Sequence, residues 1–137
     1  MGYMSRMTKD IPVVILAGGL GSRLGHYTEK VPKPLVRINE KPLIEYVISM
    51  WELRGFEQFI IAGGYKIEKL VEYFNGSTRN NVEVIDTGLN TQTGGRIKRL
   101  EKFLPEKFMM SYGDGISTAP LQNLVTSEAI VNMLIVH

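Results

Sequence analysis

The sequence predicts an α/β fold in three layers, a mostly parallel sheet with helices on both faces. Short apolar runs typical of buried strands alternate with amphipathic stretches of helical period. The first run, Pro12–Ala17, is apolar throughout, as strands buried on both faces are. Glycine-containing polar segments follow the first, third and fourth runs. They fall at the carboxyl ends of parallel strands, where such sheets bind their ligands.

Apolar stripes and turn residues set the bounds of each expected element. The first helix begins at Pro42, which a first helical turn tolerates, and ends before Gly55, a typical C-terminal cap. Asn75 and Gly76 stop the second helix. The expected elements, in order, are strand Pro12–Ala17, helix Pro42–Arg54, strand Gln58–Ala62, helix Lys66–Phe74, strand Val82–Ile85, helix Gly95–Leu104, strand Phe108–Tyr112, helix Leu121–Thr126 and strand Ile130–Val136.

The third helix, Gly95–Leu104, combines an apolar stripe with a basic one. Its apolar positions are expected to face the core, and its basic residues to form a solvated face. Arg96 stands nearest the expected site and is a secondary candidate for a phosphate contact. The apolar positions are Ile97, Leu100 and Leu104, and the basic ones are Arg96, Lys98, Arg99 and Lys102.

Length and composition restrict the class of protein. The chain has 137 residues, 44% of them hydrophobic, which suits one domain with a core. A net charge of +2 is too small to indicate nucleic-acid or membrane binding, and the absence of cysteine excludes disulfides and thiolate metal sites. No apolar run reaches the roughly 20 residues of a membrane span, so a cytoplasmic protein is expected. Residues 1–10 lack a signal-peptide pattern and are expected to be a disordered leader or cloning remnant before one domain over residues 11–137.

The glycine-rich stretch Leu16–Leu24 comes directly after the first strand and is followed by Pro32-Lys33-Pro34. Glycines let the backbone approach a phosphate and present N–H groups to it, while Arg23 and Lys33 are placed to neutralise its charge. The two prolines oppose a crossover helix here, so Gly18–Pro34 is expected to be a long loop. Long loops in compact domains are usually functional, and this one is interpreted as a triphosphate-binding loop.

Two commoner phosphate motifs fit this loop less well. A Walker loop needs a glycine followed by Lys-Ser or Lys-Thr, and none is present. In the dinucleotide fingerprint, Leu24 occupies the place of the third glycine and Gly25 comes one position late. Glu40 lies at about the spacing of a ribose-binding acid, so a dinucleotide-binding oxidoreductase fragment is kept as the weakest interpretation.

The sequence LAGGLGSRL, followed by Pro32-Lys33-Pro34, resembles the signature of the sugar-1-phosphate nucleotidyltransferases. Three further segments resemble the glucose-1-phosphate cytidylyltransferase branch of that family. They are Asp86-Thr87-Gly88, the stretch Thr93–Arg99 and Tyr112-Gly113-Asp114-Gly115. The resemblance runs from about Ile11 to about Ser117 and implies a Rossmann-like fold.

The resemblance also implies a reaction and its residues. The family joins a nucleoside triphosphate to a sugar-1-phosphate and releases pyrophosphate; CTP and glucose-1-phosphate are expected, with UTP, dTTP and GTP as alternatives. Arg23 and Lys33 are the expected catalytic residues, and Asp114 is the expected ligand of Mg²⁺. The expected nucleotide-binding residues are Leu16, Ala17, Gly18, Gly19, Gly21, Thr93, Gly94 and Gly95. Gly63-Gly64-Tyr65 is read either as lining the nucleotide pocket or as a plain turn.

Family members are substantially longer than this sequence. Their second half supplies the sugar pocket and a second metal-binding aspartate, so the sugar-binding half is expected to be absent here. A non-catalytic nucleotide-binding or assembly module is therefore kept as the alternative. Ile130–Val136 would form an edge strand with incomplete cover, which favours association between copies.

Overall fold

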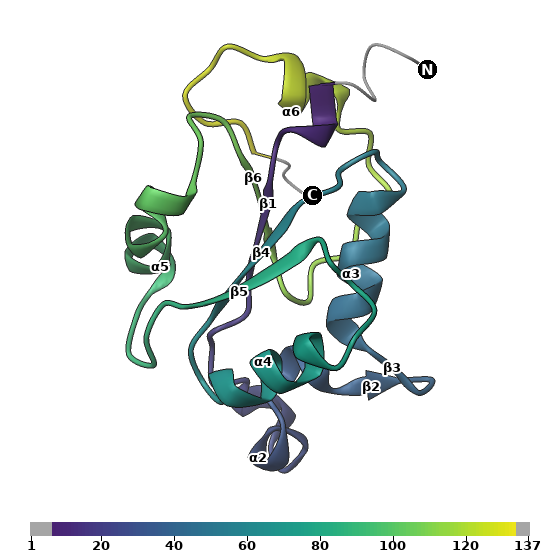
Figure 1. Ribbon diagram of the computed structural model, residues 1–137, viewed down its shortest axis with the longest axis vertical. Coiled ribbons are helices and arrows are strands. Elements are labelled where there is room, and N and C mark those ends of the chain that lie inside the picture. The colour runs from purple at the N-terminus through teal and green to yellow at the C-terminus, as the bar shows by residue number, and fades with distance from the viewer. Residues whose placement is uncertain (1–6, 134–137) are drawn as a thin grey trace.

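The computed structural model describes residues 7–133, built around one four-stranded parallel sheet (Figure 1). The strand order is β5-β4-β1-β6, which agrees with the expected parallel α/β fold. The strands are β1 (Val13–Leu16), β4 (Phe59–Gly63), β5 (Val82–Asp86) and β6 (Met109–Tyr112). No helix in the described part of the chain is long and apolar enough to cross a membrane.

Strand β1 lies at the centre of the sheet because all four of its residues are apolar and buried. It pairs in parallel with β4 on one side and with β6 on the other, so that Val13 lies opposite both Phe59 and Met109. Polar residues would leave unpaired groups on both faces of such a strand. The carboxyl end of β1, where the glycine-rich stretch begins, is thereby fixed in the middle of the sheet.

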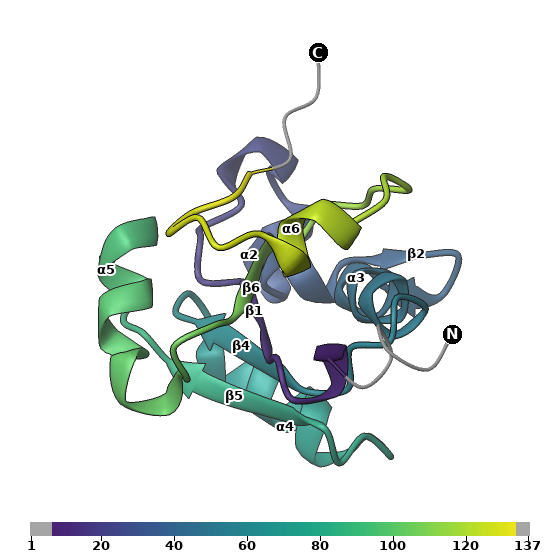
Figure 2. The ribbon, with the colours of Figure 1, turned by 90° about the horizontal axis from the view of Figure 1, so that it is seen from above.

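Helices cover both faces of the sheet, which gives the three layers (Figure 2). On one face, Ile44, Val47 and Ile48 of α3 pack against alternate residues of β1 and β4. On the other, Leu100 packs against the remaining residues of these strands. The first face carries α3 (Leu43–Glu52), α4 (Ile67–Asn75) and α6 (Gln122–Thr126), and the second carries α5 (Thr93–Arg99) with the 3₁₀ turn η3 (Glu101–Phe103).

The expected long loop, Gly18–Pro34, and the residues that follow it up to α3 contain short elements that sequence patterns do not reveal. They are the 3₁₀ turns η1 (Ser22–Leu24) and η2 (Lys33–Leu35), helix α2 (Tyr27–Lys30) and the hairpin strands β2 (Arg37–Ile38) and β3 (Lys41–Pro42). Each is too short to show a period, and the hairpin turn places the non-glycine residues Asn39 and Glu40 at positive φ. The prediction of a long loop over Gly18–Pro34 therefore did not include these short elements.

Two sequence predictions at the ends of the chain were wrong within the described residues. Residues 7–9 are helical and the Thr8 hydroxyl donates to the carbonyl oxygen of Gly55 at 2.8 Å, so this part of the expected leader packs against the domain. Residues 130–133 form no strand, and Ile130 and Val131 are exposed. Apolar side chains alone do not form a strand, because a strand also needs a neighbouring backbone that accepts and donates its hydrogen bonds. Residues 1–6 and 134–136 of these two predictions lie outside the described part.

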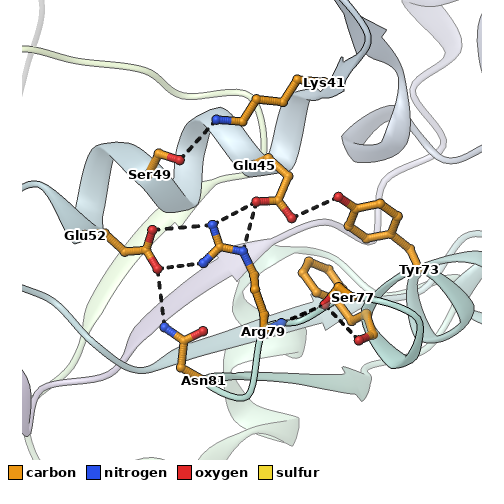
Figure 3. A network of polar contacts seen from close by, with 9 residues as sticks. Lys41, Glu45, Ser49, Glu52, Tyr73, Ser77, Arg79 and Asn81 are labelled. Carbon is orange, nitrogen blue, oxygen red and sulfur yellow. Dashed lines mark hydrogen bonds and ion pairs between the residues drawn. The ribbon is translucent and has the colours of Figure 1, made fainter.

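A polar network joins α3 to the segment that leads into β5 (Figure 3). The Arg79 guanidinium donates to Glu45 at 2.9 Å and to Glu52 at 2.6 Å, and the Tyr73 hydroxyl donates to Glu45 at 2.9 Å. Burial opposes the charge on Arg79, but the hydrogen bonds to Glu52 and Glu45 outweigh it, so the pKa of Arg79 is raised. The network fixes β5 against α3 at the end of the sheet opposite the glycine-rich loop.

Replacing Arg79 with leucine is expected to lower the free energy of unfolding by about 1–3 kcal/mol. The substitution leaves two neighbouring carboxylates, one of them on Glu45 with only 12% of its side chain exposed, without their cation. Chemical denaturation measures the change. Lys69→Ala removes an exposed ion pair to Glu72 and serves as the control, with little expected effect. An equal effect of the two variants would contradict the prediction.

Candidate functional site

A cavity of about 340 Å³ opens at the carboxyl ends of β1 and β6, at the lower end of the sheet in Figure 1. Its walls come from the glycine-rich loop, the start of η2, the approach to α5 and the end of β6. The lining residues are Leu16, Ala17, Gly18, Gly19, Gly21, Ser22, Arg23, Lys33, Pro34, Thr91, Gln92, Thr93, Arg96, Tyr112, Gly113 and Asp114. Segments almost a hundred positions apart in the sequence thus meet at one site.

The shape of the loop depends on Gly21 and Thr28. Gly21 has φ of 64°, and a Cβ there would lie 2.9 Å from the Thr28 methyl group and 3.0 Å from Cβ of Lys33. Both constraints require glycine. The buried Thr28 hydroxyl bonds to the carbonyl oxygens of Gly21 at 3.3 Å and Gly25 at 3.0 Å. Gly21 and Gly25 flank the turn η1, so these contacts set where Arg23 lies.

Arg23 and Lys33, the expected catalytic cations, both line the cavity but differ in their contacts. The Arg23 side chain is exposed and has no ion pair or hydrogen bond within residues 7–133. Lys33 begins η2 between two buried prolines, and its ammonium forms an ion pair with the carboxylate of Asp114. Arg23 is therefore free to take an anion, whereas Lys33 is held over the end of β6.

Asp114, the expected metal ligand, follows β6 at the mouth of the cavity. The chain turns tightly here, because the Gly113 N–H donates to the carbonyl oxygen of Leu16 at 2.9 Å and a Cβ on Gly113 would lie 3.0 Å from that oxygen. The Asp114 side chain is 45% exposed. Among the described residues no group of three or more His, Cys, Asp or Glu side chains gathers to hold a metal. A single carboxylate fits Mg²⁺, which takes its other ligands from phosphates and water.

Arg96 corrects the expectation of a solvated basic face, because it is 5% exposed. Its guanidinium donates to the carbonyl oxygen of Gly18 at 2.9 Å, to that of Gly88 at 2.7 Å and to the Thr87 hydroxyl at 2.8 Å. A longer bond of 3.3 Å reaches the carbonyl of Gly63. These acceptors follow or end β1, β4 and β5. Arg96 therefore joins the carboxyl ends of three strands beneath the glycine-rich loop.

The environment of Arg96 disfavours its charge. Burial is the main cause and the neighbouring Arg99 adds to it, so the pKa of Arg96 is lowered, against the attraction of Asp86. A guanidinium nevertheless stays protonated at neutral pH. The lining of the site thus includes a permanent, largely buried positive charge, which favours an anionic ligand in the cavity.

The expected base-binding residues Thr93, Gly94 and Gly95 do not all line the cavity. They form the first turn of α5, and Thr93 alone lines the cavity, while Gly94 and Gly95 are exposed. The expected helix started two residues too late and is broken by η3 after Arg99. Sequence reasoning did not assign Ser22, Pro34, Thr91, Gln92, Tyr112 or Gly113 to the cavity. Tyr112 and Gly113 adjoin the Asp114 motif, which was the available signal for them.

Replacing Gly64 with alanine tests how tightly the strand ends are packed. The new Cβ would lie 2.6 Å from the carbonyl oxygen of Gly88 and 3.0 Å from that of Gly18, both backbone atoms. The free energy of unfolding is expected to fall by about 1–3 kcal/mol in thermal or chemical denaturation. Gly94→Ala is the control, because its Cβ meets no atom within 4 Å and helix α5 gains an alanine. Equal stability of both variants would contradict this packing.

A larger cavity, of about 570 Å³, lies at the opposite end of the strands. It is lined by residues such as Pro12, Gln58 and Val82, which precede or begin β1, β4 and β5. None of the sequence-predicted site residues borders it. Ligands of open parallel sheets bind at the carboxyl ends, so the smaller cavity is the candidate functional site.

A parallel sheet with a glycine-rich loop, two cations and an aspartate at its carboxyl edge is typical of nucleotide-binding α/β proteins. The comparison with protein families gives the particular class. The chain belongs to the nucleotidyl transferase family, whose model matches residues 12–132.

Curated relatives agree with this family. The chain is 36% identical over 129 residues to the glucose-1-phosphate cytidylyltransferase of Salmonella typhimurium, covering 76% of this chain and 50% of the relative. It is 32% identical over 136 residues to the probable glucose-1-phosphate cytidylyltransferase of Bacillus subtilis, covering 82% and 54%. The chain thus spans about half the length of these relatives.

Solved structures share the fold. HddC from Yersinia pseudotuberculosis, complexed with GMP-PN, is 34% identical with a TM-score of 0.64, covering 76% of this chain and 48% of that one. The CTP:phosphocholine cytidylyltransferase LicC of Streptococcus pneumoniae is 30% identical with a TM-score of 0.61, covering 76% and 45%. Sequence and structure therefore agree on a sugar-phosphate nucleotidyltransferase type of domain.

Proposed function

We propose that residues 11–137 form the nucleotide-binding part of an enzyme that joins CTP to glucose-1-phosphate. One observation carries the proposal: Arg23, Lys33, Asp114 and the backbone of the glycine-rich loop line a single cavity at the carboxyl edge of the sheet. Both substrates are phosphates, and catalysis of phosphoryl transfer depends on positioning and on neutralising charge. The product would be a nucleotide sugar for polysaccharide biosynthesis, made in the cytoplasm, where nucleoside triphosphates are kept.

Each of these residues has a separate role in the proposed reaction. In the proposed step a phosphate oxygen of the sugar-1-phosphate attacks the α-phosphorus, and the bond to the β-phosphate oxygen breaks to release pyrophosphate. Arg23, which is exposed and has no partner among the described residues, binds the departing pyrophosphate with its planar guanidinium. Lys33 brings a point charge to the reacting phosphate. Leu16–Gly19 and Gly21 let the backbone approach the nucleotide, and Thr93 borders the base.

Asp114 is the residue that would hold Mg²⁺. When bound there, the ion would neutralise charge on the phosphates. In the structure this carboxylate pairs with the Lys33 ammonium. A cation held by Asp114 would compete with Lys33 for the carboxylate, which would leave the ammonium available to the phosphate.

The choice of CTP and glucose-1-phosphate follows the names of the Salmonella and Bacillus relatives. GTP is kept as an alternative substrate, because the D-glycero-alpha-D-manno-heptose 1-phosphate guanylyltransferase of Campylobacter jejuni is 32% identical over 121 residues. Relatives twice as long contain residues with no counterpart here, and we assign the sugar pocket and a second metal-binding aspartate to that part. A non-catalytic nucleotide-binding or assembly module remains the second candidate.

Calorimetric titration with CTP, UTP, dTTP, GTP and ATP, with and without Mg²⁺, tests the proposal. Preferential binding of CTP that strengthens with Mg²⁺ is the expected result. Pyrophosphate release is then measured with saturating glucose-1-phosphate. Binding without turnover would favour the non-catalytic module, and failure to bind any nucleotide would refute both candidates.

A further inference from the structure

Tyr65, which follows β4, spans the glycine-rich loop without lining the cavity. Its backbone N–H donates to the carbonyl oxygen of Gly18 at 3.2 Å, at the start of the loop. Its hydroxyl donates to the carbonyl oxygen of Thr28 at 3.1 Å, in α2. The side chain is half-buried between these two points. One residue outside the loop is thus bonded to both the beginning and the middle of it.

The contact to Thr28 reaches the turn that carries Arg23. Thr28 is 4% exposed, and its hydroxyl bonds to the carbonyl oxygens of Gly21 and Gly25, the residues on either side of η1. Its methyl group packs against Gly21 so closely that no Cβ fits there. A shift of Thr28 would therefore move both ends of η1. Arg23 has no contact of its own among the described residues that would keep it in place.

Lys66 adds a second attachment from the same turn. Its ammonium donates to the carbonyl oxygen of Glu29, next to Thr28. Lys66 has φ of 51°, the left-handed region that disfavours a lysine. The turn between β4 and α4 therefore directs two consecutive side chains onto α2, which lies at the bottom of Figure 1.

We propose that Tyr65 is a positioning residue that fixes the segment carrying Arg23 relative to the cavity, so that the arginine is already placed when the triphosphate arrives. The inference rests on the proposed function and deepens it, because it explains how an unpartnered arginine is presented. Pre-organisation raises affinity by removing the ordering that binding would otherwise require. Only ligands that reach Arg23 gain from it, so triphosphate binding depends on Tyr65 and monophosphate binding does not.

The substitution Tyr65→Phe tests the inference by removing one hydroxyl. We expect CTP affinity to fall about three- to tenfold, which corresponds to the loss of one hydrogen bond, and CMP affinity to stay unchanged. In an Arg23→Ala background the same substitution should have no further effect on CTP binding. Tyr46→Phe is the matched control, because the Tyr46 hydroxyl also donates to a backbone carbonyl, that of Ile38 at 2.9 Å, in the β2–β3 hairpin.

Amide hydrogen exchange in the ligand-free protein gives a readout that needs no nucleotide. Residues 21–28 should exchange faster in Tyr65→Phe than in the wild type, and no faster in Tyr46→Phe. Unchanged exchange, an equal loss of CTP and CMP affinity, or an undiminished effect in the Arg23→Ala background would each overturn the inference. A wild type that binds no nucleotide would refute the proposed function instead, while faster exchange would still support the positioning contact.

Discussion

Replacing Arg96 with alanine is expected to lower the free energy of unfolding by about 2–4 kcal/mol and to abolish measurable nucleotide binding. The guanidinium is the only donor from a described side chain to the Gly88 carbonyl, and it shares the Gly18 carbonyl with the N–H of Tyr65. Its removal also leaves a void beneath the glycine-rich loop. The effect on stability and on binding should therefore appear together.

Arg96→Lys keeps the positive charge but replaces the guanidinium, with its several donors, by a single ammonium. One ammonium cannot reach acceptors after three different strands at the same time, so most of the destabilisation should remain. Chemical denaturation and calorimetry measure the two effects. Lys98→Ala is the control, since that side chain is exposed and pairs only with Glu101 within the described residues. Stability of Arg96→Ala within about 0.5 kcal/mol of the wild type would show that the strand ends hold without it.

Replacing Arg23 or Lys33 with alanine is expected to weaken CTP binding by about 10- to 100-fold, with no loss of stability. In the proposed function each side chain would supply a charge-assisted contact to phosphate, and neither is buried in the core. Lys30→Ala, which removes an exposed lysine of the same loop, is the control and should bind as the wild type does. Loss of binding in all three variants would indicate a general electrostatic attraction instead of two specific contacts.

The two variants should differ in their response to Mg²⁺. Without Lys33 the Asp114 carboxylate loses its cation, so Mg²⁺ should bind the nucleotide-free protein more tightly in Lys33→Ala than in the wild type. Arg23→Ala should leave this affinity unchanged. Calorimetric titration with MgCl₂ distinguishes them, and Asp114→Asn should remove the difference.

The sequence predicted the parts of the fold that have a clear hydrophobic period or are bounded by proline and glycine. The apolar strand before Gly18 and the helix between Pro42 and Gly55 both formed, and three motifs at strand ends came to one edge as a parallel sheet requires. The family was predicted from the glycine-rich stretch and Pro32-Lys33-Pro34, and the family comparison confirms it. The roles of the individual site residues stay predictions.

The features that the sequence did not predict depend on contacts between distant segments. Nothing local distinguishes Arg96 from Arg99 in the basic stretch, because only the tertiary fold brings the carbonyls of Gly18 and Gly88 to it. Ile130 and Val131 have strand-like character, yet pairing needs a neighbouring backbone that the sequence cannot specify. Gly63-Gly64-Tyr65 was expected either to line the nucleotide pocket or to form a plain turn, and the contacts of Tyr65 with the loop were missed for the same reason. Patterns along the chain report local preference, while these positions are decided by distant partners.

The central place of β1 in the sheet has a consequence for the order in which the molecule folds. Strand β1 is synthesised well before one of its partners, β6, because Val13 pairs with Met109. Pairing across such sequence separations is slow, because a long loop has to close before any contact forms. Until β6 docks, one edge of β1 stays open and Asp114 is absent from the site. The cavity at the carboxyl edge is therefore complete only after β6 has paired with β1.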